Sequence, residues 1–175
     1  MNRPKTHRVY LSIGSNINRE IHVSAALDAL DQAFSPLLIS RVFESESVGF
    51  SGENFYNLVV GFDSDYSVAE LATIMHTIEQ DNERRRDGAR FGPRTLDIDI
   101  LTYGDCTGLI DGVLLPRDEI LVNAFVLVPL VDIAAEELHP LYLQSYQTLM
   151  TKPDISKQKL WPVSFIWQGR IISSA

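Results

Sequence analysis

Apolar residues recur along this chain at two spacings, one typical of strands and one typical of helices. Alternating or continuous apolar runs predict strands over residues 8–13, 37–48 and 55–62, and the acidic segment around residues 97–99 has the same period of two. Successive strand side chains point to opposite faces, so each run has one face for the core. Four strands are therefore expected before residue 104.

Helical spacing appears between these strands. One apolar stripe follows a possible cap at Asn18, and a second follows the capping box at residues 67–70. The stripes comprise Ala26, Ala29, Leu30, Ala33 and Phe34 in the first helix, and Leu71, Ile74, Met75 and Ile78 in the second. The order β-α-β-β-α-β predicts an α+β, ferredoxin-like sandwich with its helices on one face of an antiparallel sheet and the other face free for a site.

The rest of the chain extends this core. Residues 109–115 suggest a short extra strand, and residues 125–137 suggest an added C-terminal helix. We expect a single domain over residues 1–175, with a core at 8–138 and a C-terminal extension at 139–175. The extension contains Trp161, Phe165 and Trp167, so it could pack back on the core or support a dimer.

Two carboxylates stand out in the acidic strand. Asp97 and Asp99 share one face, roughly 6.5 to 7 Å apart along the strand, while Leu96, Ile98 and Ile100 share the core-facing side. Aspartate is a poor strand former and like charges repel, so a cation is expected nearby. A pair of carboxylates suits Mg²⁺, which takes one or two acidic ligands, waters and phosphate oxygens. The alternative is an exposed pair matched by surface lysine or arginine.

Five arginines come immediately before this strand. They are Arg84, Arg85, Arg86, Arg90 and Arg94. Guanidinium groups bind phosphate oxygens through paired hydrogen bonds, so arginines beside a carboxylate pair predict transfer chemistry on a nucleotide phosphate. The alternative is a solvated run of charge at the end of a helix. No Gly-x-x-x-x-Gly-Lys-Ser/Thr motif is present, so the nucleotide is not expected in a Walker-type loop.

Composition limits the class of protein. The formal net charge of −8 opposes a broad nucleic-acid-binding surface, although it allows one local basic site for a small phosphorylated ligand. The single cysteine excludes an internal disulfide framework. No signal-peptide core and no membrane-length apolar run follow the charged N-terminus, so we expect a cytoplasmic protein that binds no membrane.

The segment 90–101, with the sequence RFGPRTLDIDIL, resembles the signature of the 6-hydroxymethyl-7,8-dihydropterin pyrophosphokinase family. Four further segments match that family in order: Gly14-Ser15-Asn16, Phe55-Tyr56-Asn57, Ile78-Glu79 and residues 124–130. The resemblance implies a magnesium-dependent transfer of pyrophosphate from ATP to 6-hydroxymethyl-7,8-dihydropterin in folate biosynthesis, with release of AMP. The expected partners are these small molecules alone, and the expected assembly is a monomer or weak homodimer.

The resemblance also implies residue roles. Asp97 and Asp99 would hold two Mg²⁺ ions, and Arg84 and Arg94 would be catalytic. The nucleotide-binding set would be His76, Glu79, Arg86, Arg90, Phe91 and Arg117. The pterin would contact Ser45, Val48, Phe55, Asn57 and Phe125, with its ring stacked between the two phenylalanines. The alternatives are a place in the core for each of these pterin-contacting residues, Phe125 above all, and a plain surface pair for His76 and Glu79.

Several positions depart from the commoner family pattern, and the segment Glu44-Ser45-Glu46-Ser47-Val48 lacks the proline often found there. Arg117 stands where histidine is usual, and Asn123 stands where an arginine commonly precedes the last helix. These changes keep a second function open, namely a non-catalytic or weakly active paralogue that binds a pterin or nucleotide. An RNA-binding domain on the same fold is a third reading, but it would need basic, aromatic-rich strands, and the strands here are acidic or aliphatic.

Overall fold

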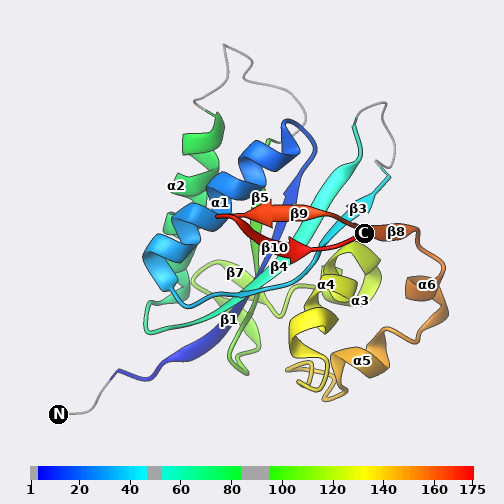
Figure 1. The fold of residues 1–175 in the computed structure, drawn as a ribbon. Coiled ribbons are helices and arrows are strands. Elements are labelled where there is room, and N and C mark those ends of the chain that lie inside the picture. The colour runs from blue at the N-terminus through cyan, green and yellow to red at the C-terminus, as the bar shows by residue number, and fades with distance from the viewer. Residues whose placement is uncertain (1–3, 47–52, 84–94) are drawn as a thin grey trace.

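An antiparallel sheet lies at the centre of the protein. The computed structural model describes residues 4–46, 53–83 and 95–175, and Figure 1 shows helices on both sides of the sheet. In these residues the sheet has six strands in the order β5-β1-β4-β3-β8, and β2 pairs with β4 beside this path. The strands are β1 (His7–Ser15), β2 (Leu38–Ile39), β3 (Val42–Ser45), β4 (Phe55–Ser64), β5 (Asp97–Tyr103) and β8 (Leu160–Val163).

Two long helices cover one face of the sheet. α1 (Arg19–Phe34) follows β1 and α2 (Val68–Glu83) follows β4, which confirms the predicted β-α-β-β-α-β order and the ferredoxin-like fold. The capping box at the start of α2 forms, because Ser67 N donates to Glu70 and Glu70 N donates to Ser67 Oγ at 3.2 Å. Ala33 is exposed, contrary to the stripe predicted for the first helix, and Val23 and Leu27 complete the buried face instead.

The second face of the sheet is only partly free. α4 (Ala124–Ala134) packs on it against Tyr10, Val59 and Leu101, so the expectation of an uncovered face is wrong for this half. The other half carries the pocket described below. Three short helices surround α4: α3 (Glu119–Val122), α5 (Tyr146–Leu149) and α6 (Pro153–Ser156). Among the described helices, none combines the length and the apolar character that crossing a bilayer requires.

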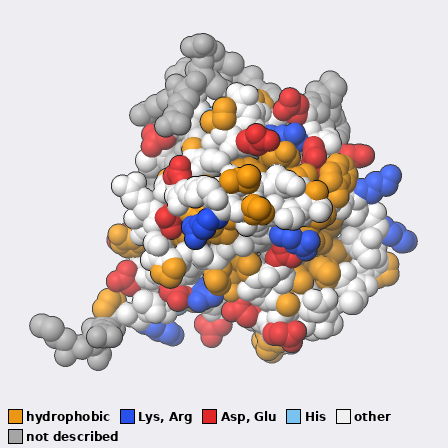
Figure 2. Space-filling view, viewed as in Figure 1, with side chains coloured by type: hydrophobic (Ala, Val, Ile, Leu, Met, Phe, Trp, Pro, Cys, Tyr) orange, Lys and Arg blue, Asp and Glu red, His pale blue; other side chains and the backbone are white. Residues whose placement is uncertain are grey.

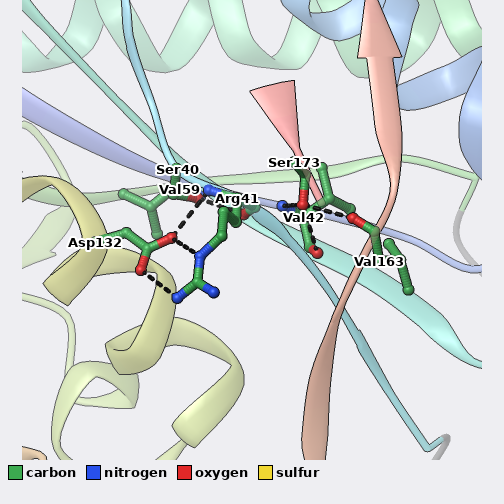
Figure 3. A network of polar contacts seen from close by, with 7 residues as sticks. All are labelled: Ser40, Arg41, Val42, Val59, Asp132, Val163 and Ser173. Atoms are coloured by element: carbon green, nitrogen blue, oxygen red, sulfur yellow. Dashed lines mark hydrogen bonds and ion pairs between the residues drawn. The ribbon is translucent and has the colours of Figure 1, made fainter. Parts of the chain in front are cut away.

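The single long strand predicted over residues 37–48 is wrong. β2 and β3 both pair with β4, but the ladder breaks between them at Ser40 and Arg41. The hydroxyl of Ser40 accepts from Val59 N at 2.9 Å, and Arg41 N donates to the Asp132 carboxylate on α4 at 3.0 Å. Figure 3 shows this network, in which the Arg41 guanidinium also binds Asp132. A side chain on another element has taken the backbone donor that a continuous strand would use.

A hairpin leads from β5 to the next helix. β6 (Gly108–Ile110) and β7 (Val113–Leu115) account for the short strand predicted at residues 109–115. Asp111 and Gly112 both have positive φ, 50° and 81°, as a tight two-residue hairpin turn requires. After the hairpin, Arg117 N donates to Leu101 O at 2.9 Å, which fixes residue 117 beside β5.

The C-terminal segment packs back on the core. β8 pairs with β3, and the hairpin of β9 (Phe165–Trp167) and β10 (Arg170–Ser173) lies against α1, where Trp167 Nε1 donates to Asp28 at 2.9 Å. The hydroxyl of Ser173 bonds both strands of the β3–β8 pair, at Val42 and Val163 (Figure 3). Figure 2 shows hydrophobic side chains in the area of β9 and β10, interspersed with acidic and basic ones.

Candidate active site

A pocket lies on the sheet face that α4 leaves uncovered. It encloses about 350 Å³ between β5, β1, the β3–β4 pair and the start of α4. Seven of the residues predicted from the sequence line it together: Ser45, Phe55, Asn57, Asp97, Asp99, Arg117 and Phe125. The structure therefore brings the predicted acidic pair and the predicted ring-stacking residues into one cavity.

The acidic pair lies where the strand period placed it. Leu96, Ile98 and Ile100 are buried in the core shared with α1 and α2, so Asp97 and Asp99 project from the opposite face into the pocket. β5 is an edge strand whose inner neighbour is β1, with Asp97 opposite Gly14 and Asp99 opposite Ser12. Both aspartates are half-buried, and they keep solvent access on the side of the pocket.

Arg117 lies between two carboxylates. Its Nη1 atom is 3.6 Å from Asp99 Oδ1, and its Nη2 atom donates to Glu119 Oε1 at 2.9 Å. Burial opposes the charge on this guanidinium, but the Glu119 bond and the nearby aspartates outweigh it, so the pKa of Arg117 is raised above its ordinary value. Burial likewise opposes the charge of Glu119, and the bond from Arg117 leaves the pKa of that carboxyl lowered. Arg117 thus supplies a cation beside the acidic pair.

The aromatic end of the pocket lies across β3, β4 and α4. Phe125 is 37% exposed and lines the cavity, so the alternative that placed it in the core is wrong. Asn57 is buried beside Phe55, and its Nδ2 atom donates to Ser45 Oγ at 2.9 Å. This bond fixes the orientation of the amide. Gly14 lies next to the amide oxygen, because a Cβ added at Gly14 would be in van der Waals contact with Asn57 Oδ1, at 3.7 Å. Two aromatic side chains and an oriented amide can bind a flat ring with polar edges.

His76 and Glu79 lie on α2, outside the residues that line this pocket. The His76 side chain is 69% exposed, and its Nδ1 atom is 4.0 Å from Glu79 Oε1. Glu79 turns towards β5, where its Oε2 atom accepts from Ile98 N at 3.3 Å. Burial raises the pKa of Glu79 to about 7, and the charges of Asp97 and Asp99 add to the rise, while the bond from Ile98 opposes it. Glu79 therefore lies against β5, close to Asp97, and responds to the charge of the acidic pair.

Several predicted site residues lie outside the described residues. They are Val48, which falls in 47–52, and Arg84, Arg86, Arg90, Phe91 and Arg94, which fall in 84–94. Their roles remain predictions.

The pocket also contains residues that the sequence did not single out as site residues: Ser12, Gly14, Glu46, Leu101, Glu119, Asn123 and Val126. For Ser12 and Gly14, the sequence did contain a signal. Val9, Leu11 and Ile13 face the core, so the alternation in β1 places Ser12 and Gly14 on the face that carries the acidic pair. Glu119 had no such signal, because its place depends on the hairpin and on Arg117.

The donor set can be tested against magnesium. Within the described ranges, no three His, Cys, Asp or Glu side chains gather as a complete metal cage. Two half-buried carboxylates at the edge of an open pocket instead match Mg²⁺, which keeps several waters and shares substrate phosphate oxygens. The guanidinium of Arg117 already provides positive charge at 3.6 Å from Asp99. The residues present therefore fit a magnesium site of the open kind.

Comparison with known proteins agrees with this geometry. Residues 10–135 match the family model described as "7,8-dihydro-6-hydroxymethylpterin-pyrophosphokinase (HPPK)". A Pseudomonas aeruginosa 2-amino-4-hydroxy-6-hydroxymethyldihydropteridine pyrophosphokinase is 35% identical over 134 residues, which cover 74% of this chain and 82% of that protein. An Aquifex aeolicus protein of the same name is 31% identical and is covered over 84% of its length.

Some relatives are much longer. The Arabidopsis thaliana "Folate synthesis bifunctional protein" is 33% identical over 74% of this chain, and the chain spans 27% of its length. The structure of wild-type Plasmodium falciparum HPPK-DHPS with pteroate superposes with a TM-score of 0.68 over 99% of this chain and 48% of that one. At 14% identity this likeness shows the fold alone. From the family model and the identities to its single-function relatives, we conclude that the chain belongs to the 7,8-dihydro-6-hydroxymethylpterin-pyrophosphokinase family.

Proposed function

We propose that this chain transfers pyrophosphate from ATP to 6-hydroxymethyl-7,8-dihydropterin and releases AMP. One observation carries the proposal: the acidic pair Asp97 and Asp99 lines the same cavity as the aromatic residues Phe55 and Phe125. A phosphate-handling end and a ring-binding end in one pocket bring the hydroxyl of a bound pterin near a bound nucleotide. Membership of the pyrophosphokinase family supports this choice of reaction.

At the ring-binding end, the pterin would stack between Phe55 and Phe125. Asn57 and Ser45 would hydrogen-bond the polar edge of the ring, with Asn57 held in one orientation by its bond to Ser45 Oγ. Because the Nδ2 atom of Asn57 donates within the protein, its Oδ1 atom would accept from an N–H group at the edge of the pterin. Aromatic faces on both sides would favour the flat ring over a bulky ligand.

At the other end, Asp97 and Asp99 would hold two Mg²⁺ ions. Bound there, the metal would neutralise the triphosphate and stabilise both the attacking and the leaving oxygen. Arg117, whose guanidinium lies beside Asp99, would contact the nucleotide phosphates. The catalytic roles of Arg84 and Arg94, and the nucleotide contacts of His76, Glu79, Arg86, Arg90 and Phe91, extend the proposal through the family resemblance.

A product assay tests this function. The protein is incubated with Mg²⁺, ATP and 6-hydroxymethyl-7,8-dihydropterin, and the nucleotide products are separated by chromatography. Formation of AMP that depends on the pterin supports pyrophosphoryl transfer. ADP would indicate an ordinary kinase, and binding of the pterin without turnover would favour the non-catalytic paralogue that Arg117 and Asn123 keep open. A reaction without the pterin controls for hydrolysis of ATP.

We also propose that the core, residues 8–138, and the extension, residues 139–175, form one domain. Support comes from the pairing of β8 with β3 and from the bond of Trp167 to Asp28 on α1. A single cooperative unfolding transition, seen equally by near-ultraviolet and far-ultraviolet circular dichroism, is expected. The cytoplasmic location and the monomeric or weakly dimeric state belong to the same proposal.

A further inference from the structure

Arg19, the first residue of α1, joins the two strands that carry one wall of the pocket. Its Nη1 atom donates to Glu44 Oε1 on β3 at 2.7 Å and to the carbonyl oxygen of Asn54 at 2.9 Å. Glu44 precedes the pocket residue Ser45, and Asn54 precedes the pocket residue Phe55. A single guanidinium group therefore holds the end of β3 and the beginning of β4.

The contact is sheltered and has further support. The side chains of Arg19 and Glu44 are 21% and 19% exposed, so water screens their attraction less than it would at an open surface. The Arg19 guanidinium lies 4.0 Å from the centre of the Tyr56 ring. The other oxygen of Glu44 accepts from Trp161 Nε1 on β8 at 3.3 Å, which ties the C-terminal extension to the same cluster.

This cluster lies behind the pocket. Tyr56 is buried in the core on the α1 side of the sheet, whereas its neighbours Phe55 and Asn57 line the pocket on the other side. The strand register places Ser45 opposite Phe55 and Glu44 opposite Tyr56. A shift at the Glu44–Arg19–Asn54 contact would therefore move Ser45 and Phe55 relative to each other, although Arg19 itself touches no ligand.

We propose that Arg19 is a positioning residue for the ring-binding wall of the pocket, acting through Glu44 and Asn54 on Ser45 and Phe55. The inference rests on the proposed function for the identity of the ring. The contacts of this cluster given above join α1 to β3, β4 and β8, whereas the proposed phosphate-binding end is on β5 and the segment after β7. Loss of Arg19 should therefore affect the two substrates unequally.

Kinetics of three variants test the proposal. Arg19→Met keeps much of the side-chain length but removes the charge and both hydrogen bonds. Its KM for the pterin should rise about fivefold to tenfold, the order expected when a charge-assisted contact that orders a wall is lost, while its KM for ATP stays near the wild-type value. Arg19→Lys keeps the positive charge and N–H donors for both oxygens, but it lacks the planar guanidinium that lies over the Tyr56 ring, so it should rescue part of the loss. Glu44→Gln should fall between Arg19→Met and wild type.

Arg8→Met is the matched control. Arg8 forms an ion pair with Asp63, also at 2.7 Å but with more exposed side chains (38% and 57%), far along β1 from the pocket. This variant should keep both KM values. An unchanged KM for the pterin in folded Arg19→Met, or an equal rise in both KM values, would overturn the proposal. If Arg19→Met does not fold, Glu44→Gln decides it: a wild-type KM for the pterin counts against a positioning role.

A second readout separates this inference from the proposed function. The chain has two tryptophans, so the indole N–H signal of Trp161 can be assigned by nuclear magnetic resonance with a Trp161→Phe variant. Arg19→Met should shift that signal and speed amide exchange in residues 53–57, and Arg8→Met should change neither. If wild-type protein makes no AMP, the proposed function fails, and these signals still decide the positioning role. Unchanged exchange in Arg19→Met would refute it.

Discussion

The guanidinium of Arg117 lies 3.6 Å from the carboxylate of Asp99, across the gap between the segment after β7 and the edge strand β5. A cation thus accompanies the acidic pair. The same guanidinium bonds Glu119 at 2.9 Å, so it can leave Asp99 without becoming an isolated charge. This arrangement makes Arg117 suited to exchange a carboxylate partner for a phosphate oxygen.

Arg117→Ala should weaken binding of ATP. We expect KM for ATP to rise about tenfold, in line with the loss of one charge-assisted contact to phosphate, with a smaller effect on KM for the pterin. Steady-state kinetics at fixed Mg²⁺ measure both constants. Arg170→Ala, at an exposed position on β10, is the control and should match wild type. An unchanged KM for ATP would remove Arg117 from the nucleotide site.

Replacing either acidic residue should nearly abolish turnover. Asp97→Asn and Asp99→Asn keep the shape of the side chain but remove the charge that would hold Mg²⁺, so kcat should fall by at least about 100-fold. Both variants should fold, because these side chains face the pocket and not the core. Asp105→Asn, in the exposed turn after β5, is the matched control. Wild-type turnover by the two site variants would disprove the metal assignment.

Glu79 should make stability depend on pH. Its folded-state pKa of about 7 lies above the ordinary value of 4.5, so between these values the folded protein holds a proton that the unfolded chain has lost. The free energy of unfolding should therefore decrease as pH rises from about 4.5 to 7 and level off above. Glu79→Gln should lose this decrease and be more stable than wild type at pH 8.

Urea titrations without Mg²⁺ at pH 4.5, 6 and 8 measure the Glu79 effect. Glu83→Gln, one turn further along α2 and exposed, should keep the wild-type profile. Equal pH profiles for Glu79→Gln and wild type would show that Glu79 ionises in the folded state as it does in the unfolded chain.

His139 should act in the opposite direction. It is 1% exposed, and its Nδ1 atom accepts from Leu141 N and Tyr142 N, both at 3.2 Å. Burial lowers its pKa below the ordinary 6.5, and Lys152 lowers it further against a smaller effect of Asp118. The unfolded chain takes up the proton first, so stability should fall as pH drops below about 6.5. The melting temperature of wild type should fall as pH drops from 7.5 to 5, and the melting temperature of His139→Gln should fall less over the same range.

The sequence predicted the parts of the fold that depend on local pattern. The order of the first four strands and two helices, the capping box and the acidic pair all follow from periodicity, and each appears in the structure. The break at Ser40 could not be predicted in this way, because the competing acceptor, Asp132, lies far along the chain on α4. Local pattern also could not show that α4 covers half of the second face.

The same division holds for the site. Asp97 and Asp99 were found because strand period and family resemblance agree, and Asn57 was found through the resemblance. Glu119 was missed and Phe125 was left between core and pocket, because the positions of both depend on how the β6–β7 hairpin and α4 pack on the sheet. Arg19 has no local signal at all, since its partners Glu44 and Asn54 lie on other elements.

Because β8 covers β3, the outer border of the sheet on this side is a four-residue strand that contains Pro162. Proline has no N–H to donate, and short strands with proline are poor templates for recruiting another chain. Pairing of β8 with a strand of a second molecule should therefore be disfavoured. Without the extension, the edge of the sheet would be β3, which contains no proline and lies beside the pocket. The extension would in this way protect that edge against aggregation.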